Sequence, residues 1–137
     1  MTDVVDEGVY VLGKNVAALE EEFNIFLENK GYFVTCASGT DSITLALIAN
    51  DLVPGSKVIV PSHTAPAYIL GIQRAGCFPF YVDFEESNLL LSFHRLRELV
   101  VKEQCKSILP VHLYGSGVDI ITLTEIQTGF NFKIIEV

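Results

Sequence analysis

The feature that most constrains the fold is the alternation of helix-like segments with short strands rich in Val and Ile. Helix-like segments are found over residues 15–29, 40–50, 64–75, 92–103 and 119–127. Strand-like apolar runs are found over residues 32–36, 57–60, 79–83, 106–111 and 132–137. After the first helix the two kinds of segment alternate, which is typical of a parallel sheet covered by helices. We therefore predict an α/β fold with a mostly parallel sheet flanked by helices.

Glycine and proline residues mark the boundaries of the predicted helices and strands. Gly31 and Gly76 follow predicted helices and provide natural C-terminal stops. Pro54 and Gly55 form a turn before the next strand, and Pro66 is compatible only with the first turn of its helix. The segmentation is therefore consistent with the local chemistry of the chain.

Length and composition exclude several classes of protein. The 137 residues suggest one compact domain, and the 50% hydrophobic content is enough for a core. With 9 basic against 17 acidic residues the net charge is -8, which argues against a nucleic-acid partner. That charge does not exclude one bound phosphate, because backbone N–H groups can hold it. No apolar run approaches the roughly 20 residues of a membrane span.

The cysteines and histidines give no sign of a metal site. Cys36, Cys77 and Cys105 are far apart and odd in number, so we expect reduced thiols in a cytoplasmic protein. His63, His94 and His112 show no metal-ligand spacing, and we predict no metal. The first ten residues are acidic and lack an apolar segment, so we expect no signal peptide.

Three predicted turns follow strands, at the edge of a parallel sheet where ligands gather. They span residues 37–40, 61–64 and 112–115. The first reads Ser38-Gly39-Thr40-Asp41 and precedes a predicted helix, so free N–H groups and two hydroxyls suit a phosphate. The alternative is that Ser38 or Thr40 only caps the helix. The turn has neither the P-loop pattern nor the G-x-G-x-x-G pattern.

Five ordered segments resemble those of one family. They are GVYVLGKNVAALEEEF, ASGTDSITLAL, VIVPSHTAPA, AGCFPFYVDFE and ILPVHLYG. Together they are similar to the DegT/StrS family of pyridoxal-phosphate-dependent sugar-nucleotide aminotransferases. The resemblance implies an aspartate-aminotransferase-type large domain and a homodimer with shared active sites. It also implies transfer of an amino group, usually from glutamate, to a keto sugar attached to a nucleoside diphosphate.

The resemblance assigns cofactor roles to residues in the three turns. Gly39 and Thr40 correspond to the pair that holds the phosphate of pyridoxal 5'-phosphate, with Ser38 and Asp41 in support. In many members an aromatic residue after the Thr of the second turn stacks on the pyridine ring, but this chain has Ala65 there. His63 is then a candidate to lie on the ring, and the alternative is that it caps or packs locally.

The third turn lies beside the cofactor in the family. His112 and Tyr114 are therefore candidates to donate hydrogen bonds near the cofactor. The alternative, left open by the sequence, is that both are packing and turn residues. Members also usually carry a short helix before the GVYVLG segment, and we expect this chain to start too late to include it.

Transamination needs a lysine that forms a Schiff base with the cofactor and an acid beside the pyridine nitrogen. In the family the acid follows the last strand, whereas here Glu136 is followed by Val137. The lysine belongs to an S-x-x-K motif further on. The chain's six lysines fall at predicted surface or strand-edge positions, and these are Lys14, Lys30, Lys57, Lys102, Lys106 and Lys133. We therefore predict no catalytic residue, and expect residues 1–137 to be a truncated large domain that is inactive alone and binds pyridoxal 5'-phosphate weakly or not at all.

Two alternative functions remain open from the sequence. The chain could be a non-catalytic module that pairs with a full-length homologue, because active sites of the family form between subunits and an exposed hydrophobic face would favour association. It could also be part of a pyridoxal-phosphate sugar dehydratase, in which a His replaces the Schiff-base lysine. The residue that separates dehydration from transamination does not occur in this sequence.

Overall fold

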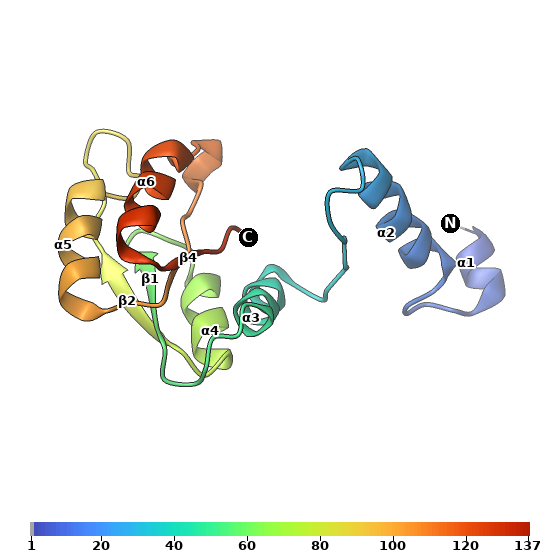
Figure 1. Ribbon diagram of the computed structural model, residues 1–137. Coiled ribbons are helices and arrows are strands. Elements are labelled where there is room, and N and C mark those ends of the chain that lie inside the picture. Colours follow the sequence, from blue (N-terminus) through green and yellow to red (C-terminus); the bar gives the residue numbers. More distant parts are fainter. Residues whose placement is uncertain (1) are drawn as a thin grey trace. The chain divides into compact units, whose positions relative to one another are not determined.

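The computed structural model describes residues 2–137 as two compact units, one ending at Ala37 and the other spanning Ser38–Val137. The first unit contains two helices, α1 (Thr2–Glu7) and α2 (Lys14–Phe26), shown in blue in Figure 1. A short helix thus does precede the GVYVLG segment, so the expectation that it would be missing is wrong. The helix predicted over 15–29 ends three residues early, at Phe26.

The strand predicted over 32–36 is wrong, because that segment has no regular secondary structure. It lies along α2 instead and bonds to side chains of the helix. The N–H of Phe33 donates to Asn24 Oδ1 at 2.5 Å, and the Phe33 ring stacks on Phe23 with 4.3 Å between centroids. The N–H and hydroxyl of Thr35 both donate to Glu20, at 2.8 and 2.7 Å. A short apolar run can satisfy its backbone N–H groups on the side chains of a helix as well as in a sheet.

These bonds make the conformation of residues 33–35 sensitive to acid. The backbone N–H of Thr35, followed by its hydroxyl, lowers the pKa of Glu20 from the ordinary 4.5. Because the folded pKa is lowered, the contact's stabilisation is fully present above about pH 4.5 and is lost as pH falls through the lowered value. We expect the amide signal of Thr35 to titrate with a midpoint below 4.5, and Thr35→Val to move the Glu20 midpoint upward. A midpoint at or above 4.5 in the native chain would contradict the contact.

The second unit is built on a parallel sheet. Its helices are α3 (Gly39–Ala49), α4 (Pro66–Arg74), α5 (Phe93–Glu103) and α6 (Ile120–Phe130), with a 3₁₀ turn at Leu113–Gly115. Its strands are β1 (Lys57–Pro61), β2 (Phe78–Val82), β3 (Ser107–Ile108) and β4 (Lys133–Ile134). The strand order is β2-β1-β3-β4 and every pairing is parallel. The predicted parallel sheet flanked by helices is therefore confirmed.

The last two strands are shorter than the sequence predicts. Residues 106–111 and 132–137 each give only two ladder residues. Pro110 has no N–H to donate, so the ladder of β3 cannot continue through it. The N–H of Leu109 still donates to Ile59, and that of Ile135 to Ile108, at 2.9 and 3.0 Å. The apolar character of both runs reflects burial rather than further strand pairing.

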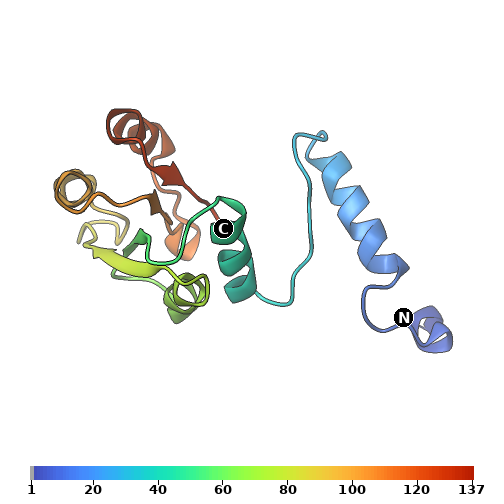
Figure 2. The ribbon, with the colours of Figure 1, turned by 60° about the horizontal axis from the view of Figure 1, so that its bottom comes forward.

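Alternation along β1 divides the core into two layers. Val58 and Val60 face α3 and α4 and pack with Ile43, whereas Ile59 faces α5 and α6 and packs with Leu96. Figure 2 shows α5 and α6 (orange to red) across the sheet from α3 and α4 (teal and green). Because both faces are covered, β1 reads as a continuous apolar run. None of the helices in the described part of the chain is long and apolar enough to cross a membrane.

The cysteines and lysines lie largely as the sequence predicts. Cys77 and Cys105 are buried, Cys36 is exposed, and none of the three forms a disulfide. Burial raises the pKa of Cys105 to about 11, which keeps this thiol protonated and unreactive. Five of the six lysines are exposed, and the half-buried Lys57 donates to Glu103 at 2.8 Å from the edge of its strand.

Candidate functional site

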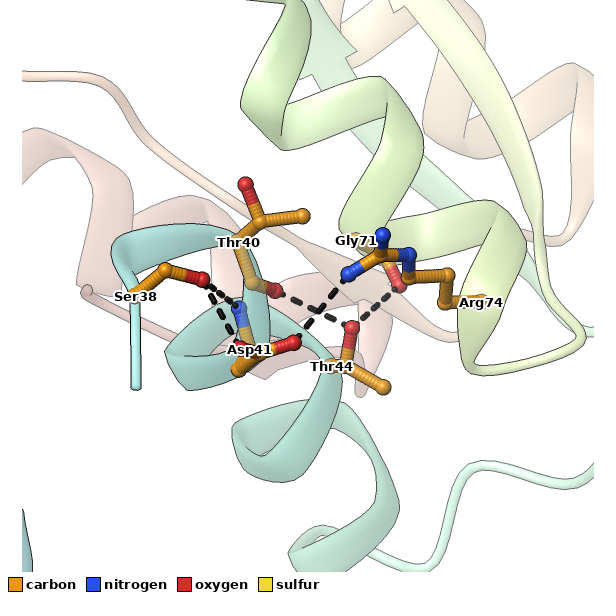
Figure 3. Close-up of polar contacts among 6 residues, drawn as sticks. All are labelled: Ser38, Thr40, Asp41, Thr44, Gly71 and Arg74. Carbon is orange, nitrogen blue, oxygen red and sulfur yellow. Dashed lines mark hydrogen bonds and ion pairs between the residues drawn. The ribbon is translucent and has the colours of Figure 1, made fainter. Parts of the chain in front are cut away.

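The first turn of α3 carries the strongest candidate site. Ser38 is the N-cap: its Oγ accepts from the Asp41 N–H at 3.2 Å and donates to Asp41 Oδ2 at 2.8 Å (Figure 3). The N–H of Ser42 donates to the Ser38 carbonyl at 2.9 Å. These contacts confirm the capping interpretation for Ser38, and the hydroxyl of Ser38 is already engaged.

Two backbone donors remain in this turn. The N–H groups of Gly39 and Thr40 lie at the start of α3, where the helix offers no carbonyl to accept from them. No other acceptor for them is found among residues 2–137. A Cβ built on Gly39 would meet nothing within 4 Å, so the backbone is open to close approach. Figure 3 shows the Thr40 hydroxyl directed away from Asp41 and Arg74. Two N–H groups and one hydroxyl are therefore available to an anion.

The charge of Asp41 is compensated by a neighbouring helix. Its carboxylate accepts from Arg74 Nη1 at 3.1 Å, and Arg74 lies in the last turn of α4. An acid in the first turn is stabilised by the helix dipole, but it would repel a bound anion. The guanidinium offsets this repulsion, so the first turn of α3 keeps its favourable cap and can still accept a negative group.

The same turn is anchored on α4 by close backbone packing. Thr44 Oγ1 donates to the carbonyls of Thr40 and Gly71, at 3.0 and 3.2 Å (Figure 3). A Cβ on Gly71 would lie 2.6 Å from Ile43 Cγ2 and 3.1 Å from the Thr40 carbonyl, so only glycine permits this approach. At its other end α3 receives a bond from Lys133 Nζ, at the start of β4, to the Asn50 carbonyl. The C-terminal end of α3 therefore lies near the start of β4, and the first turn of α3 lies at the opposite end of the helix.

The turn after β1 makes contacts of a different kind. His63 is half-buried and meets Phe84 edge to face, with 5.3 Å between ring centroids. Local packing of His63, the alternative left open by the sequence, is therefore present. The hydroxyl of Thr64 is buried and has no hydrogen-bond partner among the described residues. Nothing in the sequence singles out this orphaned hydroxyl, because its burial depends on the surrounding fold.

The turn after β3 is organised by His112. Its Nδ1 accepts from the Val118 N–H and its Nε2 bonds Glu136 Oε1, both at 3.0 Å. Both ring nitrogens are therefore engaged within the chain. Tyr114 is 84% exposed and has a positive φ of 54°, so its side chain does not pack in the core. The sequence places His112 in this turn, but not its partner Glu136, which lies 24 residues further on.

The donors at the start of α3 fit a phosphate group. N–H groups at a helix N-terminus together with a hydroxyl are the donors that phosphate oxygens accept from. Gly39 leaves room for those oxygens, and Arg74 balances the nearby acid. The fit of this turn therefore concerns a phosphate group alone.

Comparison with known proteins gives one consistent family. The sequence profile of the DegT/DnrJ/EryC1/StrS aminotransferase family matches residues 1–136. The chain is 35% identical over 133 residues to the dTDP-3-amino-3,4,6-trideoxy-alpha-D-glucose transaminase of Streptomyces venezuelae, covering 97% of this chain and 35% of that protein. It is 31% identical over 136 residues to the 3-oxo-glucose-6-phosphate:glutamate aminotransferase of Bacillus subtilis, covering 99% of this chain and 30% of that protein.

Solved structures extend the likeness to the fold. The crystal structure of NtdA from Bacillus subtilis with bound cofactor PMP matches with a TM-score of 0.90 and 31% identity. The match covers 98% of this chain and 31% of that one. It confirms the aminotransferase-type large-domain fold that the resemblance implies. The chain spans 30% to 37% of the length of the curated relatives that it matches.

Proposed function

The chain belongs to the DegT/DnrJ/EryC1/StrS aminotransferase family, and we propose that it holds the phosphate of pyridoxal 5'-phosphate in a sugar aminotransferase. The amino donor is glutamate, and the acceptor is a keto sugar attached to a nucleoside diphosphate. Because the chain covers about a third of its relatives' length, substrate, donor and a homodimeric assembly are proposed for the complete enzyme. We assign no catalytic residue within residues 1–137.

The observation that carries this proposal is the open first turn of α3. The N–H groups of Gly39 and Thr40 and the Thr40 hydroxyl donate to the phosphate oxygens. Ser38 and Asp41 support them by holding the turn in its capped form, and Arg74 offsets the Asp41 charge. When bound, the pyridoxal ring supplies an electron sink for amino transfer. The chain's own contribution is to bind and orient its phosphate.

The two histidines have different roles in this proposal. His63 would be the residue that contacts the pyridine ring, in place of the aromatic residue that Ala65 does not supply, and its edge-to-face contact with Phe84 would hold its orientation. His112 has both nitrogens engaged by Val118 and Glu136. It therefore acts through these partners rather than by donating to the cofactor. Transamination is favoured over sugar dehydration because the curated relatives cited above are aminotransferases.

The test compares two ligands that differ only in the phosphate. Pyridoxamine 5'-phosphate and pyridoxamine are titrated into the 137-residue chain by calorimetry, since neither reacts with lysine amines as the aldehyde would. We expect the phosphorylated ligand to bind at least about tenfold more tightly, because charge-assisted hydrogen bonds contribute about 1.5–3 kcal/mol each. Thr40→Val removes one donor without changing side-chain shape, and should weaken binding by about tenfold.

Thr128→Val is the matched control. Thr128 lies on α6 and its hydroxyl donates to the Thr124 carbonyl at 2.9 Å, away from α3. The same change of residue type there should leave affinity unaltered. Equal affinity for the two ligands, or an unaltered affinity in Thr40→Val, would overturn the proposed phosphate role.

A further inference from the structure

His112 joins three segments of the chain through one imidazole ring. The residue itself follows β3, its Nδ1 accepts from Val118 just before α6, and its Nε2 bonds Glu136 just after β4. Val118 is buried in the core layer that α5 and α6 cover, and this packing fixes its position. The ring thus connects a fixed point in the core with the end of the last strand.

The proton of the ring is placed by its partners. A backbone N–H can only donate, so Nδ1 must be unprotonated to accept from Val118. In the neutral imidazole the proton is then on Nε2, where it is donated to the carboxylate of Glu136. One tautomer, protonated at Nε2, satisfies both contacts. The other tautomer breaks both of them, and the doubly protonated ring breaks the bond with Val118.

The His112 ring lies just beyond the end of the hydrogen-bond ladder between β3 and β4. The last backbone bond between the two strands runs from the Ile135 N–H to the Ile108 carbonyl at 3.0 Å. The bond between His112 and Glu136 continues this connection past the ladder. Between His112 and Val118 the chain passes through two positive φ angles, 54° at Tyr114 and 82° at Gly115. A left-handed conformation is unfavourable for Tyr114 and persists only where the surroundings impose it.

We propose that His112 is a positioning residue. Protonated at Nε2, it fixes the strained turn 112–118 and the carboxyl end of β4 relative to each other, at the edge of the sheet. The contacts with Val118 and Glu136 stand independently of any ligand. The consequence for cofactor binding rests on the proposed function: with both segments held, the surroundings of the cofactor are preorganised.

The test uses substitutions that each keep one of the two contacts. His112→Asn retains an acceptor near the position of Nδ1, whereas His112→Gln retains a donor near the position of Nε2. Glu136→Gln keeps an acceptor oxygen, and Glu136→Leu removes it. Ser92→Ala removes the N-cap of α5 and is the control for a general loss of stability. NMR measures the ring-nitrogen signals of the native chain and the hydrogen exchange of the Val118 amide, and calorimetry measures affinity for pyridoxamine 5'-phosphate.

We expect the native spectrum to show Nε2 protonated and Nδ1 unprotonated. Exchange of the Val118 amide should be about tenfold faster in His112→Gln and within about twofold of native in His112→Asn. Affinity for pyridoxamine 5'-phosphate should fall about fivefold in both His112 variants and in Glu136→Leu. It should stay within about twofold in Glu136→Gln and Ser92→Ala.

Three results would overturn the proposal. A proton on Nδ1 in the native chain would show, without any variant, that His112 does not accept from the Val118 N–H. Equal Val118 exchange in the Asn and Gln variants would show that the ring does not hold this amide. Unchanged affinity in all variants would refute the positioning role. If the native chain shows no preference for the phosphorylated ligand, the proposed function fails, whereas the tautomer and exchange results still decide the arrangement around His112.

Discussion

Gly71→Ala is expected to lower the free energy of unfolding of the second unit by about 2 kcal/mol, a large effect for one methyl group. The added Cβ would lie 2.6 Å from Cγ2 and 2.7 Å from Cβ of Ile43, and 3.1 Å from the Thr40 carbonyl. Ile43 is 2% exposed and branched at Cβ, so it cannot rotate away from the methyl group. Helices α3 and α4 must therefore move apart, and the contacts of Thr44 that anchor the first turn of α3 are weakened.

Gly129→Ala is the matched control, because it makes the same change inside a helix without a clash. A Cβ there would meet nothing within 4 Å, and alanine is favoured over glycine in a helix by about 1 kcal/mol. This variant should therefore be more stable than the native chain. Urea unfolding followed by far-UV circular dichroism measures both changes. Gly71→Ala with native or increased stability would show that the two helices do not pack as closely as described.

The parts of the fold that the sequence predicts are those set by periodicity and by short-range signals. Helix α3 is expected over 40–50 and found at Gly39–Ala49, and Pro66 falls at the first position of α4, where proline is tolerated. The strand prediction for 32–36 fails because the segment has no neighbouring strand within the part of the chain that the structure describes, and Tyr32 and Val34 are 97% and 72% exposed. Its backbone N–H groups donate to the side chains of Glu20 and Asn24 on α2, and a short apolar run carries no signal for that partner.

For the candidate site, the sequence predicts the local part and misses the long-range part. The position of Ser38 before Gly39 and Thr40 indicates a capped helix start with free donors, and this is found. The Arg74 partner of Asp41 lies 33 residues away, and the Glu136 partner of His112 lies 24 residues away. Such pairs depend on how α4 crosses α3 and on which strands are neighbours. One sequence without homologues carries no signal for either.

Gly39→Asp is expected to weaken phosphate binding without lowering the stability of the chain. The new side chain has space, since a Cβ at this position meets nothing within 4 Å. An acid in the first turn is favoured by the helix dipole, and Asp is a better helix residue than Gly, so the melting temperature should not fall. The carboxylate would nevertheless stand where we propose that the phosphate binds.

We expect this variant to bind pyridoxamine 5'-phosphate about a hundredfold more weakly than the native chain, because like charges a few ångströms apart repel by several kcal/mol near a protein surface. Gly39→Asn has nearly the same size without the charge, and should lose about tenfold or less. Added salt should narrow the gap between the two variants, since it screens charge but not volume. If Asp and Asn weaken binding equally, the loss is steric. If neither weakens it, the phosphate does not bind at the first turn of α3, and the ligand's charge must be held by another part of the chain.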